Sequence, residues 1–117
     1  MTQGARTPEE LEALLEDAFV TRDAEALCGM FAEGAVLAIG EGSDAAQGTE
    51  EIGRLATALW AGDRTYIAEP RLVVQARDTA LVLADRAINV VRRGSDGAWR
   101  YTIALLSLDS TPTKEEP

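Results

Sequence analysis

The apolar residues of this chain change their spacing once, near Arg64, and this change constrains the fold more than any other feature. Before Arg64 they recur every three or four residues, as on one face of a helix, except for the short apolar run at 35–39, which suits a strand. After Arg64 they alternate, as on one face of a strand. The spacing predicts the order helix, helix, strand, helix and three strands, which is the fold class α+β.

Capping residues and glycines set the expected helix limits. Thr7 can cap the first helix, Pro8 suits its first position and Glu10 completes a capping box. The second helix is expected within 23–34 and the third within 49–62, since each range starts at a capping residue and stops at a glycine. The residues expected to be buried along these helices are Leu14, Leu15, Phe19, Leu27, Phe31, Ile52, Leu55 and Leu59.

Strands are expected near 35–39, 64–76, 79–91 and 98–108. Pro70 indicates an edge position or a bulge for the second of these, because proline cannot donate to a neighbouring strand. The last two strands are apolar on both faces, and three short helices can cover only one side of a sheet. A homodimer through the outer face of the sheet is therefore predicted.

The domain organisation is simple. A chain of 117 residues suits one domain, which we expect to span 7–109 between flexible ends at 1–6 and 110–117. The start of the sequence lacks the pattern of a signal peptide, and no apolar run has the length of a membrane helix. The sequence thus predicts a cytoplasmic protein that does not bind membranes.

Composition excludes several chemistries. The net charge of -9 and the scattered arginines leave no basic stripe, so nucleic acid is not an expected partner. The chain has no histidine, which removes histidine bases and histidine-ligated zinc. Its one lysine, Lys114, lies in the polar tail, and its one cysteine, Cys28, can form no internal disulfide.

No cofactor and no metal are predicted. Residues 40–45 fit a loose dinucleotide pattern, but no alternation of strands and helices of adequate length follows them. Glu41, Asp44, Glu50 and Glu51 lack the spacing of a calcium loop, and acidic residues at the start of a helix are explained by its dipole.

Five short segments carry a resemblance to a known family. In their order and spacing the chain resembles the nuclear transport factor 2-like superfamily, closest to its small bacterial SnoaL-like and steroid-isomerase-like members. The resemblance implies a cone-shaped, cystatin-like fold, with three N-terminal helices packed on a curved antiparallel sheet. Members of the superfamily usually have another hairpin between the strand that corresponds to 80–82 and the hairpin that corresponds to Asp96–Tyr101. Only residues 85–93 fill that gap here, so the sheet is expected to be shortened by about one hairpin. The segments are Thr7–Glu10, Asp23–Leu27, Met30–Val36, Gly48–Ile52 and Asp96–Tyr101.

The resemblance also locates the positions where related enzymes keep catalytic groups. The tyrosine of the oxyanion hole in steroid isomerases falls on Leu15, and the aspartate that moves the proton falls on Ile39. The second aspartate falls near Asn89. The histidine and aspartate of SnoaL-like cyclases have no counterpart, since the chain has no histidine. The standard catalytic set of these relatives is therefore absent.

Asp85 is the remaining candidate for catalysis. Strand alternation places it on one face with Leu83 and Asn89, and the resemblance puts that face inside the cone. Aliphatic surroundings would raise the pKa of its carboxyl group and make it a general base. The alternative is that Asp85 faces water or pairs with Arg86 or Arg100.

Three functions remain open from the sequence. The first is binding of a small hydrophobic molecule in an apolar pocket. The second is an isomerase, cyclase or hydratase with Asp85 as base, and the third is a dimeric association module with a vestigial pocket. The residues that could line the pocket are Phe31, Trp60, Tyr66, Leu83, Asn89, Trp99 and Tyr101.

Overall fold

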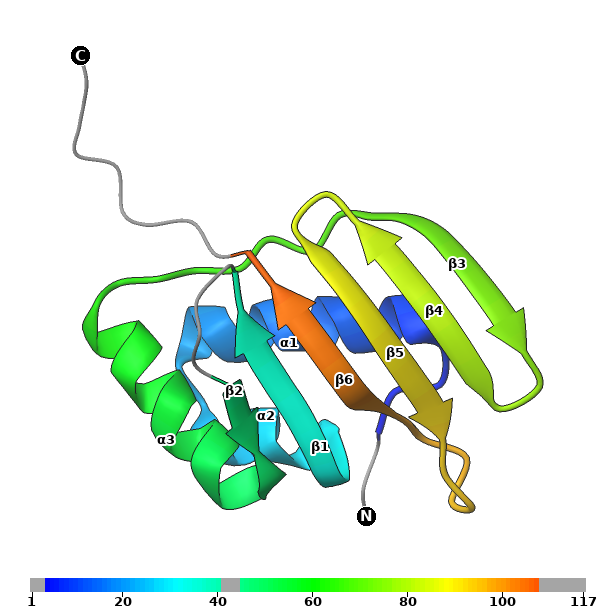
Figure 1. Cartoon of the computed structure of the whole chain (residues 1–117), viewed down its shortest axis with the longest axis horizontal. Coiled ribbons are helices and arrows are strands. Elements are labelled where there is room, and N and C mark those ends of the chain that lie inside the picture. The colour runs from blue at the N-terminus through cyan, green and yellow to red at the C-terminus, as the bar shows by residue number, and fades with distance from the viewer. Residues whose placement is uncertain (1–3, 41–44, 108–117) are drawn as a thin grey trace.

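The computed structural model describes residues 4–40 and 45–107, and within them it contains three helices and six strands (Figure 1). This element content confirms the class α+β. The helices are α1 (Pro8–Thr21), α2 (Ala24–Gly29) and α3 (Gly48–Ala61). The strands are β1 (Phe31–Ile39), β2 (Ala45–Gln47), β3 (Pro70–Ala76), β4 (Thr79–Ala84), β5 (Ala87–Arg93) and β6 (Trp99–Leu106).

Local hydrogen bonds fix the helix starts close to where the sequence predicts them. The Thr7 hydroxyl accepts a hydrogen bond from the Glu10 backbone N–H at 3.0 Å, and α1 ends at Arg22 in the left-handed conformation with φ 55°. The Asp23 carboxylate caps α2 by accepting from the Ala26 N–H at 3.1 Å. At the start of α3 the Glu51 carboxylate accepts from the Gln47 N–H at 2.9 Å.

The six strands form one sheet in the order β2-β1-β6-β5-β4-β3. All neighbours are antiparallel except β1 and β6, which are parallel. In Figure 1 the helices lie behind the sheet, and the buried apolar residues of α1, α3 and the inward-facing strand positions form one core. Of the helix residues expected in this core, six are buried, whereas Leu14 and Leu55 are half-buried at its border.

The structure corrects the limits of two elements. Phe31 was expected at the end of the second helix, but α2 stops at Gly29 and Phe31 begins β1 beside Tyr101 of β6. The strand expected from residue 64 begins only at Pro70. The short strand β2 was not predicted, because its three residues carry no alternation long enough to detect.

The prediction of a single strand over 79–91 is wrong. This segment forms two strands, β4 and β5, joined by a turn at Asp85 and Arg86, and Ala84 pairs with Ala87. Together with β2, this division gives the sheet six strands where the sequence predicts four. Residues that pair across two strands share a face of the sheet. The even-numbered residues of β4 therefore face inward together with the odd-numbered residues of β5. Leu83 therefore lies on the face opposite to Asn89, contrary to expectation.

An irregularity in β6 reverses its faces as well. Val90 pairs with Ile103 and Val91 pairs with Tyr101, so Thr102 is an extra residue on β6. Tyr101 is buried on the inner face, whereas Ile103 is 49% exposed on the outer face. Tyr101 and Ile103 therefore lie on opposite faces, although regular alternation along the strand expected at 98–108 would place them on one face.

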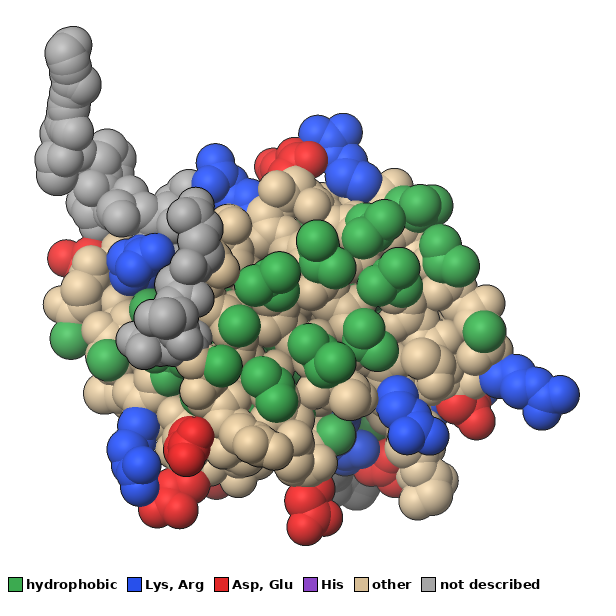
Figure 2. All heavy atoms as spheres, viewed as in Figure 1, with side chains coloured by type: hydrophobic (Ala, Val, Ile, Leu, Met, Phe, Trp, Pro, Cys, Tyr) green, Lys and Arg blue, Asp and Glu red, His purple; other side chains and the backbone are tan. Residues whose placement is uncertain are grey.

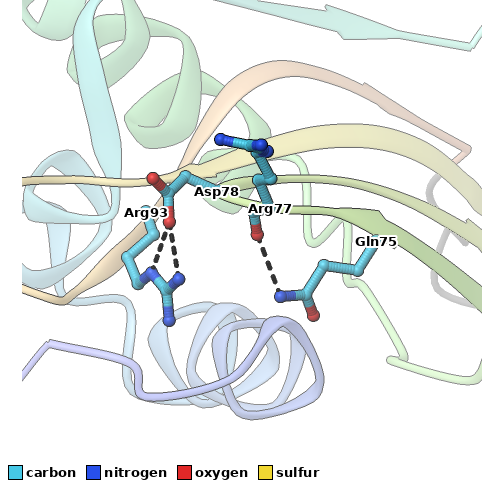
Figure 3. Close-up of polar contacts among 4 residues, drawn as sticks. All are labelled: Gln75, Arg77, Asp78 and Arg93. Carbon is cyan, nitrogen blue, oxygen red and sulfur yellow. Dashed lines mark hydrogen bonds and ion pairs between the residues drawn. The ribbon is translucent and has the colours of Figure 1, made fainter.

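Arg77 and Asp78 form the turn between β3 and β4, in the gap between the strands expected at 64–76 and 79–91, and side chains brace this turn (Figure 3). Arg77 has a positive φ of 58°, and its carbonyl oxygen accepts a hydrogen bond from the Gln75 amide at 3.0 Å. The Asp78 carboxylate accepts from Arg93 Nε at 2.9 Å, which links this turn to the end of β5.

Candidate functional site

The main polar feature of the interior is the carboxylate of Glu12, which is 1% exposed. Its Oε1 accepts a hydrogen bond from the Tyr66 hydroxyl at 2.6 Å. Its Oε2 accepts from the Asn89 amide and from the Tyr101 hydroxyl, each at 2.7 Å. We call these four residues the Glu12 cluster. A buried carboxylate is costly unless donors surround it, and here three neutral donors do so.

Four separate parts of the chain build the Glu12 cluster. Glu12 comes from the inward face of α1, Tyr66 from the connection between α3 and β3, Asn89 from β5 and Tyr101 from β6. The Asn89 side-chain oxygen accepts a hydrogen bond from the Leu105 N–H at 3.2 Å, which holds the amide so that its nitrogen faces Glu12. The cluster therefore ties the first helix to the centre of the sheet.

Burial and the negative charge of Glu12 both raise the pKa values of the two tyrosine hydroxyls. Burial raises the pKa of the Tyr66 hydroxyl most, and the charge of Glu12 and the hydrogen bond to it raise it further. The pKa of Tyr101 is raised by burial first and by Glu12 second. Both hydroxyls therefore stay protonated and act as donors while the protein is folded.

Aromatic rings fill the space around the Glu12 cluster. Phe19 packs edge-on against Trp60, with ring centroids 5.7 Å apart, and lies 6.2 Å from Tyr66. Phe31 packs against Tyr101 at 5.2 Å. Of the predicted pocket residues, Tyr66, Asn89 and Tyr101 thus meet at Glu12, and Phe31 and Trp60 are buried beside them.

Trp99 lines a cavity of about 330 Å³ at the end of the sheet where β6 begins. We call this cavity the α1–α2 groove, because the two helices form its other walls. Such a volume lies at the lower end of the range for small-molecule sites. The lining residues are Gly4, Ala5, Leu11, Leu14, Glu25, Ala26, Gly29, Met30, Ala98, Trp99 and Arg100.

The structure places Asp85 away from the interior. It lies in the β4–β5 turn, and its two carboxylate oxygens accept from Arg71 Nε at 2.7 Å and Arg71 Nη2 at 2.8 Å. The hydrogen bonds from Arg71 lower the pKa of this carboxyl group. A low pKa and an exposed position do not favour a general base. The sequence interpretation missed the turn that takes Asp85 out of the strand.

Glu12 is the interior residue that the sequence interpretation missed, although a signal was present. It lies three residues before Leu15 and seven before Phe19, which is the spacing of one helix face. A charged residue on an apolar helix face is a candidate for a buried functional or structural group. Only the partners from β5, β6 and the α3–β3 connection identify what it binds.

The acidic residues near α3 do not form a metal site in the described part of the chain. Glu50 pairs with Arg54, and Glu51 accepts from the backbone at Gln47. No group of three metal-binding side chains occurs in residues 4–40 and 45–107. Glu41 and Asp44 lie outside the described residues, and so do residues 41–44 of the dinucleotide-like pattern at 40–45. None of the helices in this part has the length and apolar character needed to span a membrane.

The sheet face turned away from the helices is apolar (Figure 2). Two rows of paired residues cross the strands on this face. The first row is Leu72, Leu83, Ile88 and Leu105, and the second is Val74, Leu81, Val90 and Ile103. We call these eight residues the outer apolar face. Leu72, Val74, Ile88 and Ile103 are each about half exposed, at 49–53%.

Comparison with known proteins identifies the fold. The sequence matches no protein-family model and no curated protein sequence. Among solved structures, a ketosteroid isomerase-like protein from Erwinia carotovora atroseptica SCRI1043 superimposes with TM-score 0.72 at 21% identity, over 88% of this chain and 94% of that one.

Two further solved structures also superimpose on this chain. A putative calcium/calmodulin-dependent protein kinase type II association domain from Thiobacillus denitrificans gives TM-score 0.74 at 17% identity, over 91% of this chain and 98% of that one. A nuclear transport factor 2-like protein with a cystatin-like fold from Novosphingobium aromaticivorans gives a TM-score of 0.66 at 24% identity, over 90% of this chain and 81% of that one. The chain therefore has the nuclear transport factor 2-like fold.

Proposed function

We propose that this chain is a small-molecule-binding domain, and that the α1–α2 groove is its binding site. The observation that supports this function is the groove itself, which has a volume of about 330 Å³ and walls formed largely by apolar side chains. Of its apolar lining, Leu14 and Ala98 are half-buried and Ala26 is exposed, whereas Leu11, Met30 and Trp99 are buried. The ligand that suits these walls is a small, largely hydrophobic molecule.

The Glu12 cluster makes the inner walls of the groove rigid. Glu12 follows Leu11 on α1, and Tyr101 lies on the same face of β6 as Trp99. The hydrogen bonds of the cluster therefore fix the two elements that carry the main apolar walls. A site whose walls are fixed before binding loses less entropy when a ligand enters.

A substitution at Gly29 tests the groove directly. A Cβ atom added at this position would meet no atom within 4 Å, and Gly29 lines the groove from α2. We expect Gly29→Leu to fill the groove and to weaken binding of the fluorescent apolar probe anilinonaphthalene sulfonate at least about tenfold, or ~1.4 kcal/mol. Fluorescence titration of the purified protein measures this change.

The matched control is Ala58→Leu, which adds the same side chain to an exposed position of α3. It should leave probe affinity unchanged. A thermal-shift measurement gives an independent readout, because a ligand that binds only the folded state raises the melting temperature. Equal affinity of the wild type and Gly29→Leu would refute binding in the groove.

A second candidate function is association of two copies through the outer apolar face. Eight apolar side chains occupy one contiguous area over β3, β4, β5 and β6 (Figure 2). A contiguous apolar area of this kind marks an interaction surface, and the same area on a second copy related by a two-fold axis is the commonest partner. Charged side chains lie at its border, as at the rim of an interface.

We expect the wild type to be a dimer at micromolar concentration and Ile88→Asp to be a monomer. Ile88 lies within the outer apolar face, and a carboxylate there would be buried without a partner in the dimer. Sedimentation velocity measures both states. The control is Val20→Asp, because Val20 is 68% exposed on α1 and lies outside this face. A monomeric wild type, or a dimer that survives Ile88→Asp, contradicts this interface.

A further inference from the structure

Among the described residues, two charged side chains line the α1–α2 groove, those of Glu25 and Arg100. Glu25 comes from the first turn of α2, and Arg100 comes from the start of β6. The other described lining residues are glycine, alanine, leucine, methionine and tryptophan, which carry no charge. The local charge that a ligand meets in the groove therefore depends on what balances these two side chains.

The positive charge of Arg100 is balanced within the chain. Its Nη2 donates to Oδ2 of Asp96 at 2.7 Å, and its Nη1 donates to Oδ1 of Asp96 at 3.2 Å. The hydrogen bonds from Arg100 lower the pKa of the Asp96 carboxyl group to about 2, so Asp96 is ionised at neutral pH. An anionic ligand would have to compete with Asp96 for this guanidinium group.

The negative charge of Glu25 has no such balance. Its side chain is exposed, and in residues 4–40 and 45–107 no group forms a hydrogen bond or an ion pair with its carboxylate. The net charge of -9 on the whole chain acts in the same direction at longer range. The groove thus combines apolar walls with one negative charge that the described part of the chain does not neutralise.

We propose that the ligand of the α1–α2 groove is a hydrophobic cation, an apolar molecule with one ammonium group that lies against Glu25. This inference rests on the proposed function, because it assigns the ligand class of the same groove. An ammonium group beside Glu25 is attracted, whereas a carboxylate in the same place is repelled. The apolar part of the ligand binds the walls in either case, so the two contributions can be measured separately.

Three probes with the same apolar group test the charge preference of the wild type. Phenylbutylamine is positive, phenylbutanol is neutral and phenylbutyrate is negative at neutral pH. At low ionic strength we expect the amine to bind about threefold more tightly than the alcohol, and the carboxylate about threefold more weakly, as for an ion pair at a partly exposed site. Isothermal titration calorimetry measures the three affinities. Added salt should reduce the differences, because ions screen the charge.

Glu25→Gln tests the contact itself. It keeps the size of the side chain and removes the charge, so the amine should lose its advantage of about threefold while phenylbutanol keeps its affinity. The matched control is Glu9→Gln. Glu9 is likewise an exposed glutamate in the first turn of a helix, but it does not line the groove. Both variants change the net charge equally and remove an acid that favours its helix dipole, so only a local contact distinguishes them.

The inference is overturned if the wild type binds the amine and the alcohol equally, or if Glu25→Gln and Glu9→Gln reduce the preference to the same extent. In either case, binding of phenylbutanol that weakens in Gly29→Leu would still support the groove as the binding site. If none of the three probes binds, the proposed function fails and this inference fails with it. Circular dichroism verifies that each variant is folded.

Discussion

Replacing Glu12 with alanine should lower the free energy of unfolding by at least about 3 kcal/mol. The substitution removes the acceptor for three buried donors, on Tyr66, Asn89 and Tyr101. Each buried donor left without an acceptor costs roughly 1–3 kcal/mol. Urea unfolding followed by circular dichroism measures the change, and the slope with denaturant verifies that the folded state stays compact.

Two further variants serve as controls for Glu12→Ala. Glu12→Gln keeps the shape and one acceptor oxygen, so its loss should be smaller than that of Glu12→Ala. Glu9→Ala removes an exposed glutamate from the same helix and should stay within about 0.5 kcal/mol of the wild type. A loss below about 1 kcal/mol for Glu12→Ala would mean that the donors find other partners and that the cluster does not fix the inner walls of the groove.

The tyrosines give the cluster a spectroscopic readout. The chain has two tyrosines, and both belong to the cluster. Their pKa values are raised in the folded state, whereas an unfolded tyrosine titrates near 10. The folded state therefore holds protons that the unfolded state releases, so this contribution to stability is complete below about pH 10 and is lost as pH rises further. Tyrosinate absorbance should appear together with alkaline unfolding rather than before it.

Replacing Phe19 with alanine should cost about 3–5 kcal/mol of stability. Phe19 is 4% exposed and packs against both Trp60 and Tyr66, so its removal leaves a cavity between α1, α3 and the sheet. Unfolding in urea measures the loss. Trp60 fluorescence should change as well, because its ring loses an edge-on partner.

The control for this variant is Val20→Ala, the next residue along α1, whose side chain is 68% exposed. Its effect should stay within about 0.5 kcal/mol. Similar losses at Phe19 and Val20 would mean that the helix presents a different face to the sheet, and the packing of α1 described above would then be wrong.

The sequence by itself determined the elements whose signals are local. Caps such as Thr7 and Asp23 form hydrogen bonds within three residues, so they specify a helix start wherever the chain goes afterwards. The change from helical to alternating spacing depends only on which side of an element is buried. These local rules predicted three helices and the strands of an α+β fold. The resemblance of five segments predicted the antiparallel sheet and the fold that the solved structures share.

The tertiary structure alone decided which side chains face inward and which of them meet. Alternation continues only while a strand is regular, and one turn or one extra residue exchanges its two faces. The turn at Asp85 and Arg86 puts Asp85 and Leu83 outside the interior. The extra residue Thr102 puts Ile103 on the outer face of β6. Glu12 depends on partners from 54 to 89 residues away, and no local pattern encodes contacts at that separation. Its carboxylate is buried because three distant donors converge on it, which only the packed helix and sheet achieve.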